Sequence, residues 1–129
     1  MAQELVREMM SGQVLTCEPD TILYDAIELM ALRNIGAVVV EEDGRAVGIL
    51  TERDVLKRVV LGGLQVRHEQ VRAVYTPDLV SIKPEQSIDE VVQKMFSGRF
   101  RHLPVMENGR VIGMVSSTDV VRYLATRGG

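Results

Sequence analysis

The sequence predicts a mixed α/β fold in which two β-α-β-β-α repeats pack about a pseudo-two-fold axis. The first observation is a duplication: residues 6–60 align with residues 71–125 without a gap. The second is the pattern within each copy, where apolar residues at helical spacing alternate with β-branched runs typical of strands. The third is size, because a unit this small cannot cover the apolar face of its own sheet, whereas two such units packed together can.

Each copy is expected to begin with a short apolar strand, at residues 14–17 and at residues 79–82, which a following proline ends. An amphipathic helix comes next in each copy. Its apolar positions are Leu23, Ala26, Ile27, Met30 and Ala31 in the first copy, and Ile88, Val91, Val92, Met95 and Phe96 in the second. Ser87 and Glu90 have the spacing of a capping box, which predicts that the second of these helices begins there.

Two β-branched strands follow the helix in each copy. They are joined by Asp43-Gly44 in the first copy and by Asn108-Gly109 in the second. These dipeptides favour type I′ turns, so both pairs of strands are predicted to form hairpins.

A last helix is expected after Thr51 in the first copy and after Ser116 in the second. The first of these should end at the glycine pair 62–63, and the second should run almost to the glycine pair 128–129. We therefore place one repeat at residues 6–60, a linker at residues 61–70 and the other repeat at residues 71–125. The two repeats together form one domain.

The composition argues against several classes of protein. The formal charge is −3, which disfavours nucleic acid as a partner. No apolar run has the roughly 18–20 residues that a membrane span needs, and the N-terminus does not have the pattern of a signal peptide. The single cysteine, Cys17, excludes an internal disulfide and suits the reducing cytoplasm, where we expect the protein to be located.

One short motif occurs in both copies: a glycine, two apolar residues, a hydroxyl residue, two further residues and an aspartate. It covers residues 48–54 and residues 113–119. A hydroxyl residue three positions before an acid is also the spacing of a helix N-cap, which stabilises a helix by about 1 kcal/mol. A role as a helix cap is compatible with a role in binding a ligand, because a capped helix start can also hold a ligand.

Other candidates for chemistry are weak. Cys17 aligns with Ile82, which favours a hydrophobic strand residue over a nucleophile. His68 and His102 do not form a metal-ligand set with one cysteine, so no metal site is expected. No catalytic set of Ser-His-Asp or Cys-His residues repeats, and no Walker A or GxGxxG loop is present, so we do not expect an enzyme.

With these features the chain resembles a tandem pair of CBS domains over about residues 6–125. The gapless duplication, the repeated glycine-to-aspartate motif and the sequence RHLPV at residues 101–105 support the resemblance. The resemblance implies a sensor that binds an adenosine ligand, most simply AMP, with ADP, ATP or S-adenosylmethionine as alternatives. It also implies two ligand clefts between the repeats and self-association.

Carried over by the resemblance, each cleft combines residues of both repeats. The residues of the first cleft are Ile49, Thr51, Arg53, Asp54, Ser81, Ile82, Arg101 and His102. Those of the second cleft are Thr16, Cys17, Gly36, Ala37, Met114, Ser116, Thr118 and Asp119. The aspartates would accept hydrogen bonds from the ribose hydroxyls, and the hydroxyl residues and cations would bind phosphate.

The two clefts are expected to be unequal. Arg101 and His102 align with Gly36 and Ala37, which carry no charge, so the first cleft should bind a nucleotide more tightly. The expected function is a homodimeric sensor that signals ligand occupancy to a partner on a separate chain. The alternative is a scaffold for dimerisation or docking whose clefts bind no ligand.

Overall fold

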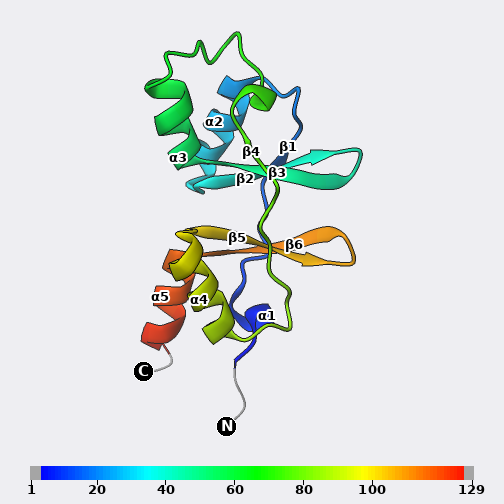
Figure 1. The fold of residues 1–129 in the computed structure, drawn as a ribbon, viewed down its shortest axis with the longest axis vertical. Helices are drawn as coiled ribbons and strands as arrows, with labels where there is room; N and C mark the ends of the chain where they lie inside the picture. The colour runs from blue at the N-terminus through cyan, green and yellow to red at the C-terminus, as the bar shows by residue number, and fades with distance from the viewer. Residues whose placement is uncertain (1–3, 127–129) are drawn as a thin grey trace. The chain divides into compact units, whose positions relative to one another are not determined.

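The computed structural model describes residues 4–126, and the chain divides into two compact units (Figure 1). Residues 15–79 form one unit, which we call the central unit. Residues 4–14 and residues 80–126 form the other, which we call the terminal unit.

The central unit is a sheet of four strands with helices packed on one face (Figure 1). Strand order is β1-β2-β3-β4; β1 is parallel to β2, and the other neighbouring pairs are antiparallel. The elements are β1 (Thr16–Cys17), α2 (Leu23–Arg33), β2 (Ala37–Glu42), β3 (Arg45–Thr51), α3 (Glu52–Asp54), the π-helix η1 (Val55–Val60), the 3-10 helix η2 (Val71–Ala73) and β4 (Thr76–Pro77).

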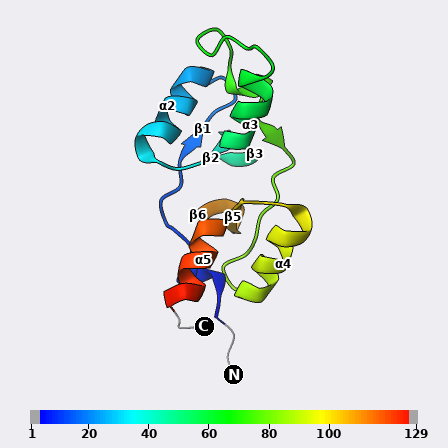
Figure 2. The same ribbon diagram turned by 90° about the vertical axis from the view of Figure 1, so that its left-hand side faces the viewer.

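The terminal unit contains one antiparallel hairpin, and two of its helices, α4 and α5, lie side by side against it (Figure 2). Its elements are α1 (Val6–Met9), α4 (Ile88–Gly98), β5 (His102–Glu107), β6 (Arg110–Ser116) and α5 (Ser117–Thr126). Ser87 and Glu90 form the predicted capping box at the start of α4. The predicted end of the last helix near Gly129 lies outside the described residues.

The hairpin turns confirm the prediction from the glycine dipeptides. Asp43 and Gly44 have φ angles of 54° and 78°, and Asn108 and Gly109 have φ angles of 53° and 78°. Positive φ at both central residues is the requirement of a type I′ turn. Each hairpin also has a register shift, one after Val40 and the other after its counterpart Val105.

The start of each sequence repeat packs in the unit that contains the rest of the other repeat. Val6 is fully buried in the core of the terminal unit, where it lies with Ile82, Val91 and Leu103. Val71 is fully buried in the core of the central unit. The boundaries of the compact units therefore differ from those of the sequence repeats.

The segment between the repeats is packed on the central unit. The N–H of Leu23 donates to the carbonyl oxygen of Glu69 at 2.8 Å, and the N–H of Tyr24 donates to that of Val66 at 3.0 Å. The Arg67 guanidinium lies 3.9 Å from the centre of the Tyr24 ring.

The expected strand at residues 79–82 is reduced to a single bridge between Ile82 and Val105. Proline explains the difference between the two copies. In the central unit the N–H of Val39 donates to the carbonyl oxygen of Leu15 at 2.8 Å. Pro104 is the counterpart of Val39 and has no N–H to donate, so the equivalent ladder is one hydrogen bond shorter.

Two further local differences concern the central unit. The helix expected after Thr51 is wound as α only over Glu52–Asp54 and continues as the π-helix η1, a distinction that apolar spacing cannot make. The strand β4 was not predicted, because two residues are too few to show a pattern. None of the helices formed by residues 4–126 has the length and apolar character needed to cross a bilayer.

Candidate functional site

The repeated motif of the central unit closes into a compact loop at the start of α3. The N–H of Thr51 donates to Asp54 Oδ2 at 2.9 Å, and the Thr51 hydroxyl donates to the same oxygen at 3.1 Å. The N–H of Asp54 in turn donates to Thr51 Oγ1 at 3.2 Å. The capping role is therefore confirmed, and it holds the Asp54 carboxylate in one orientation.

The other oxygen of Asp54 is also engaged. The Thr76 hydroxyl donates to Asp54 Oδ1 at 3.0 Å, and the Arg58 Nε lies 3.9 Å from the same oxygen. Arg58 also donates to the carbonyl oxygens of Val74 and Tyr75, at 2.9 Å and 3.3 Å. Asp54 is buried, with 8% of its surface exposed, so this network accounts for its burial as a charged group.

The motif of the terminal unit forms a looser version of the same loop. The N–H of Ser116 donates to Asp119 Oδ2 at 2.8 Å, and the N–H of Asp119 donates to Ser116 Oγ at 3.1 Å. Arg122 lies 3.5 Å from Asp119 Oδ1, but its side chain is 68% exposed. A pair this exposed contributes little to stability, so this aspartate is held more weakly than Asp54.

Within each unit, the structure places residues assigned to different predicted clefts next to one another. Ala37 pairs with Thr51 across the hairpin, and the N–H of Glu52 donates to the carbonyl oxygen of Gly36 at 3.0 Å. The equivalent contacts in the terminal unit pair His102 with Ser116 and join the N–H of Ser117 to the carbonyl oxygen of Arg101 at 2.9 Å.

The predicted site residues therefore form two groups, one in each unit. The group in the central unit is Thr16, Cys17, Gly36, Ala37, Ile49, Thr51, Arg53 and Asp54. The group in the terminal unit is Ser81, Ile82, Arg101, His102, Met114, Ser116, Thr118 and Asp119. Arg53, Arg101 and Thr118 are exposed, whereas Ile82 and Met114 are buried among core residues. The pairing of these groups into two clefts stays a prediction.

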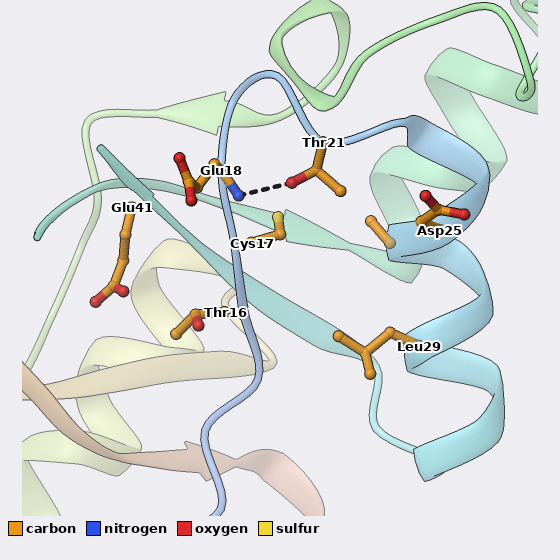
Figure 3. Close-up of a pocket in the computed structure, with 8 residues that line it drawn as sticks. Thr16, Cys17, Glu18, Thr21, Asp25, Leu29 and Glu41 are labelled. Atoms are coloured by element: carbon orange, nitrogen blue, oxygen red, sulfur yellow. Dashed lines mark hydrogen bonds between the residues drawn. The ribbon is translucent and has the colours of Figure 1, made fainter. Parts of the chain in front are cut away.

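Thr16 and Cys17 line a groove of about 400 Å³ in the central unit (Figure 3). The carboxylates of Glu18, Asp25 and Glu41 also line this groove. Burial, with the nearby charge of Glu18, raises the pKa of the Cys17 thiol to about 11. The thiol is therefore protonated at neutral pH, as expected for a packing residue rather than a nucleophile.

In the terminal unit, the positions aligned with the groove residues include Lys83 and Lys94, which the sequence analysis did not identify as candidate site residues. Lys94 is half-buried and donates to the carbonyl oxygen of Ser81 at 2.8 Å. Its counterpart in the central unit is Leu29, which lines the groove. Comparison of the two copies position by position would have identified Lys94, because only one copy has a charge there.

The residues described by the structure contain no group of three or more His, Cys, Asp or Glu side chains that could hold a metal ion. The functional groups that the two motifs present are carboxylates, hydroxyls and backbone N–H groups. Such groups suit hydrogen bonding to a polar ligand.

Comparisons with known proteins agree with this architecture. The sequence profile of the CBS domain matches residues 6–61 and again residues 71–126. A mitochondrial CBS domain-containing protein of Arabidopsis thaliana is 37% identical over 116 residues, which are 86% of this chain and 56% of that protein. The chain thus spans about half the length of this relative.

Solved structures share the whole fold. A protein with CBS domains from Burkholderia ambifaria is 32% identical, with a TM-score of 0.92 over 98% of this chain and 97% of that one. The CBS domain pair of protein MJ0100, solved with 5′-methylthioadenosine and S-adenosyl-L-methionine, is 22% identical, with a TM-score of 0.87 over 98% of this chain and 99% of that one. The chain belongs to the CBS domain family, as a tandem pair of CBS repeats.

Proposed function

We propose that the chain is a sensor of adenosine ligands, with AMP as the first candidate and ADP, ATP or S-adenosylmethionine as alternatives. The observation that supports this most directly is the repeated loop with an oriented carboxylate, formed by Thr51 and Asp54 and again by Ser116 and Asp119. An oriented carboxylate can accept hydrogen bonds from ribose hydroxyls at the acceptor positions that the protein does not use. The adenosine ligands of MJ0100, which has the same fold, give further support.

The first cleft, with Asp54 on one side and Arg101 and His102 on the other, is proposed to bind nucleotide phosphate more tightly than the second. Arg101 is exposed and always charged, so it can make charge-assisted hydrogen bonds to phosphate. In the second cleft, Gly36 and Ala37 offer no charge at the aligned positions.

The charges beside Thr16 and Cys17, and beside their counterparts Ser81 and Ile82, support the same preference. The groove beside Thr16 and Cys17 is lined by Glu18, Asp25 and Glu41, three negative charges that repel phosphate. At the aligned positions the terminal unit has Lys83, Glu90 and Met106, together with Lys94 in place of Leu29. The local charge there is two cations less one carboxylate, or +1, against −3 in the central unit.

Thermal unfolding with a panel of ligands tests the proposal. AMP, ADP, ATP and S-adenosylmethionine should be compared with GMP and ribose 5-phosphate as controls. A ligand present at 100 times its dissociation constant stabilises a protein by about 2.7 kcal/mol, which is a shift of several degrees for a domain of this size. We expect such a shift with at least one adenosine ligand and none with ribose 5-phosphate. The absence of a shift with every adenosine compound would contradict the proposal.

A scaffold without ligand is the second candidate, and one observation favours it. Both oxygens of Asp54 already accept hydrogen bonds from the protein itself, so the loop is complete without a ligand. In that case the thermal midpoint would not respond to any nucleotide.

Self-association and signalling complete the proposal. Large apolar side chains are exposed on helices of both units and directly after η1, and we propose that a second copy of the chain covers them. They include Leu56, Val60, Leu61, Phe96, Val121 and Leu124. We further propose that the protein acts in the cytoplasm on a partner that is a separate chain.

A further inference from the structure

The two aspartates that are proposed to bind ribose differ in how many protein hydrogen-bond donors their carboxylate oxygens already accept from. A carboxylate has about four acceptor positions. At Asp54 the N–H and the hydroxyl of Thr51 use Oδ2, and the hydroxyl of Thr76 uses Oδ1. The Arg58 guanidinium faces the same Oδ1 at 3.9 Å. Too few positions remain for the two hydroxyls of a ribose.

The duplication supplies an internal comparison for the Thr76 contact. The counterpart of Thr76 is Ser11, which pairs with Met114 as Thr76 pairs with Ile49. The Ser11 hydroxyl, however, accepts a hydrogen bond from the N–H of Gln13 at 3.2 Å, so it is engaged with its own loop. At Asp119, the Oδ1 oxygen faces the exposed Arg122 side chain at 3.5 Å.

Arg58 is also specific to the central unit, because its counterpart in the other copy is Tyr123. By binding the carbonyl oxygens of Val74 and Tyr75, Arg58 joins η1 to the chain directly before Thr76. Arg58 therefore supports the position of Thr76 as well as facing Asp54. The contact between Thr76 and Asp54 therefore belongs to the central unit, where it joins the two sequence repeats, and is not a general property of the motif.

We propose that Thr76 determines the affinity of the Asp54 half-site, because its hydroxyl competes with a ribose for Asp54 Oδ1. This inference rests on the proposed function. A nucleoside with a 2′,3′-diol must displace the Thr76 hydroxyl before both of its own hydroxyls can bind, whereas Asp119 accepts them without such a step. The contact between Thr76 and Asp54 therefore lowers the affinity of the first cleft for AMP, whereas Arg101 is proposed to raise it.

Calorimetric titration of AMP tests the inference at one half-site when the other is disabled. In an Asp119→Asn background, Thr76→Val removes the competing hydroxyl and keeps the shape of the side chain. Loss of one hydrogen bond to a charged group predicts that AMP binds about tenfold more tightly. Thr76→Ser keeps the hydroxyl and should bind AMP as the background does. Ser11→Ala, at the matched position, should also leave the affinity unchanged.

A second probe separates competition from a general effect on folding. 2′-Deoxy-AMP offers only one ribose hydroxyl to the carboxylate, so it needs one acceptor position and the Thr76 hydroxyl can stay. The gain caused by Thr76→Val should therefore be at least threefold smaller for 2′-deoxy-AMP than for AMP. Thr76→Ala serves as a second variant without the hydroxyl if valine perturbs folding.

The outcomes distinguish the two claims. Tighter AMP binding by Thr76→Val, with Thr76→Ser unchanged, supports the competition. If the background protein binds AMP and Thr76→Val weakens that binding, the competition is overturned, because Thr76 would then orient Asp54 for the ligand. Unchanged binding in Thr76→Val also overturns it, because Thr76 would then have no role. If neither the unmodified protein nor any of these variants binds AMP, the proposed function itself fails.

Discussion

Gly48 and Gly113 are the glycines of the two repeated motifs, and the structure gives them a packing reason. A Cβ at Gly48 would meet the carbonyl oxygen of Thr76 and the ring of Tyr75. A Cβ at Gly113 would lie 2.7 Å from Met10 Sδ and 2.9 Å from the carbonyl oxygen of Ser11. In each unit the start of the other repeat crosses the hairpin at the glycine, so the crossing requires a residue without a side chain.

Alanine at these two glycines should therefore destabilise the protein to different degrees. Gly48→Ala meets a backbone oxygen and a ring and should cost about 3 kcal/mol, within the range for overpacking. Gly113→Ala meets the flexible end of Met10 as well as a backbone oxygen, and should cost about 1–2 kcal/mol. Urea unfolding measures both. Gly12→Ala is the control, because nothing lies within 4 Å of its added Cβ. Equal stabilities of Gly48→Ala and Gly12→Ala would contradict this account.

At the residue scale, the sequence predicted the chemistry of the motif better than its geometry. The capping contacts of Thr51 and the turn geometry of Asp43 and Gly44 follow from local rules and are confirmed. The contact of Thr76 with Asp54 could not be predicted, because it joins residues 22 positions apart through the pairing of β3 with β4.

The helix α4, like α3, begins with a complete capping box. Ser87 Oγ accepts from the N–H of Glu90 at 3.2 Å, and Glu90 Oε1 accepts from the N–H of Ser87 at 3.3 Å. The hydrogen bond from the Ser87 backbone, followed by side-chain hydrogen bonds from Gln86 and Ser87, lowers the pKa of Glu90 from its ordinary value of 4.5. The charged form of Glu90 is therefore favoured in the folded protein.

The lowered pKa predicts how the free energy of unfolding depends on pH. A carboxyl whose pKa is lower in the folded state adds stability above its unfolded pKa and loses it as the pH falls through the folded value. Wild type should be more stable than Glu90→Gln at pH 7, and the difference should shrink below about pH 4.5. Urea unfolding from pH 7 to pH 3 measures it. A difference that stays constant over this range would contradict the assignment.

At the element scale, helices and hairpins with their own caps and turns were predictable, whereas the exchange of starting segments was not. In the sequence, Val6 and Val71 are ordinary apolar residues at aligned positions of the two copies. The residues around them do not indicate which of the two hydrophobic cores each one packs in. The effect of Pro104 could have been predicted, because proline cannot donate to the ladder that Val39 completes in the other copy.

At the scale of the whole molecule, the exposed apolar side chains are the feature that the isolated chain leaves unexplained. Leu56 is 61% exposed and Phe96 is 88% exposed. A contiguous apolar surface on a helix usually marks an interaction site. Exposed leucine and valine side chains lie within residues 52–61 and within residues 117–126, one range in each unit.

Replacing one such side chain should weaken a dimer of this 14.4 kDa chain. In a two-fold symmetric dimer a substitution acts twice, so Leu56→Gln should raise the dissociation constant at least tenfold. Lys57→Gln, at the neighbouring exposed position, should leave it unchanged. Sedimentation over a range of concentrations compares them. A wild-type protein that sediments as a monomer at micromolar concentration would contradict the proposed dimer.

The fold class and the family could be predicted at this scale because the duplication was visible in the sequence without a gap. The pairing of motif residues into clefts and the identity of the ligand could not. Both depend on which side chains face each other across two units, and pattern within one repeat does not contain that information.

Calorimetric titration of AMP into the unmodified protein and into Asp54→Ala, Arg101→Ala and Asp119→Ala tests the central claim most directly. We expect saturable binding of AMP to the unmodified protein. Asp54→Ala and Arg101→Ala should each weaken binding at the tighter site at least tenfold, because one charge-assisted hydrogen bond is worth about 1.5–3 kcal/mol. Asp119→Ala should leave the affinity of the tighter site unchanged. Loss of the tighter site in Asp119→Ala alone would assign it to the other repeat. No heat of binding in the unmodified protein, with AMP or any other adenosine ligand, would contradict the claim that this chain is a sensor of adenosine ligands.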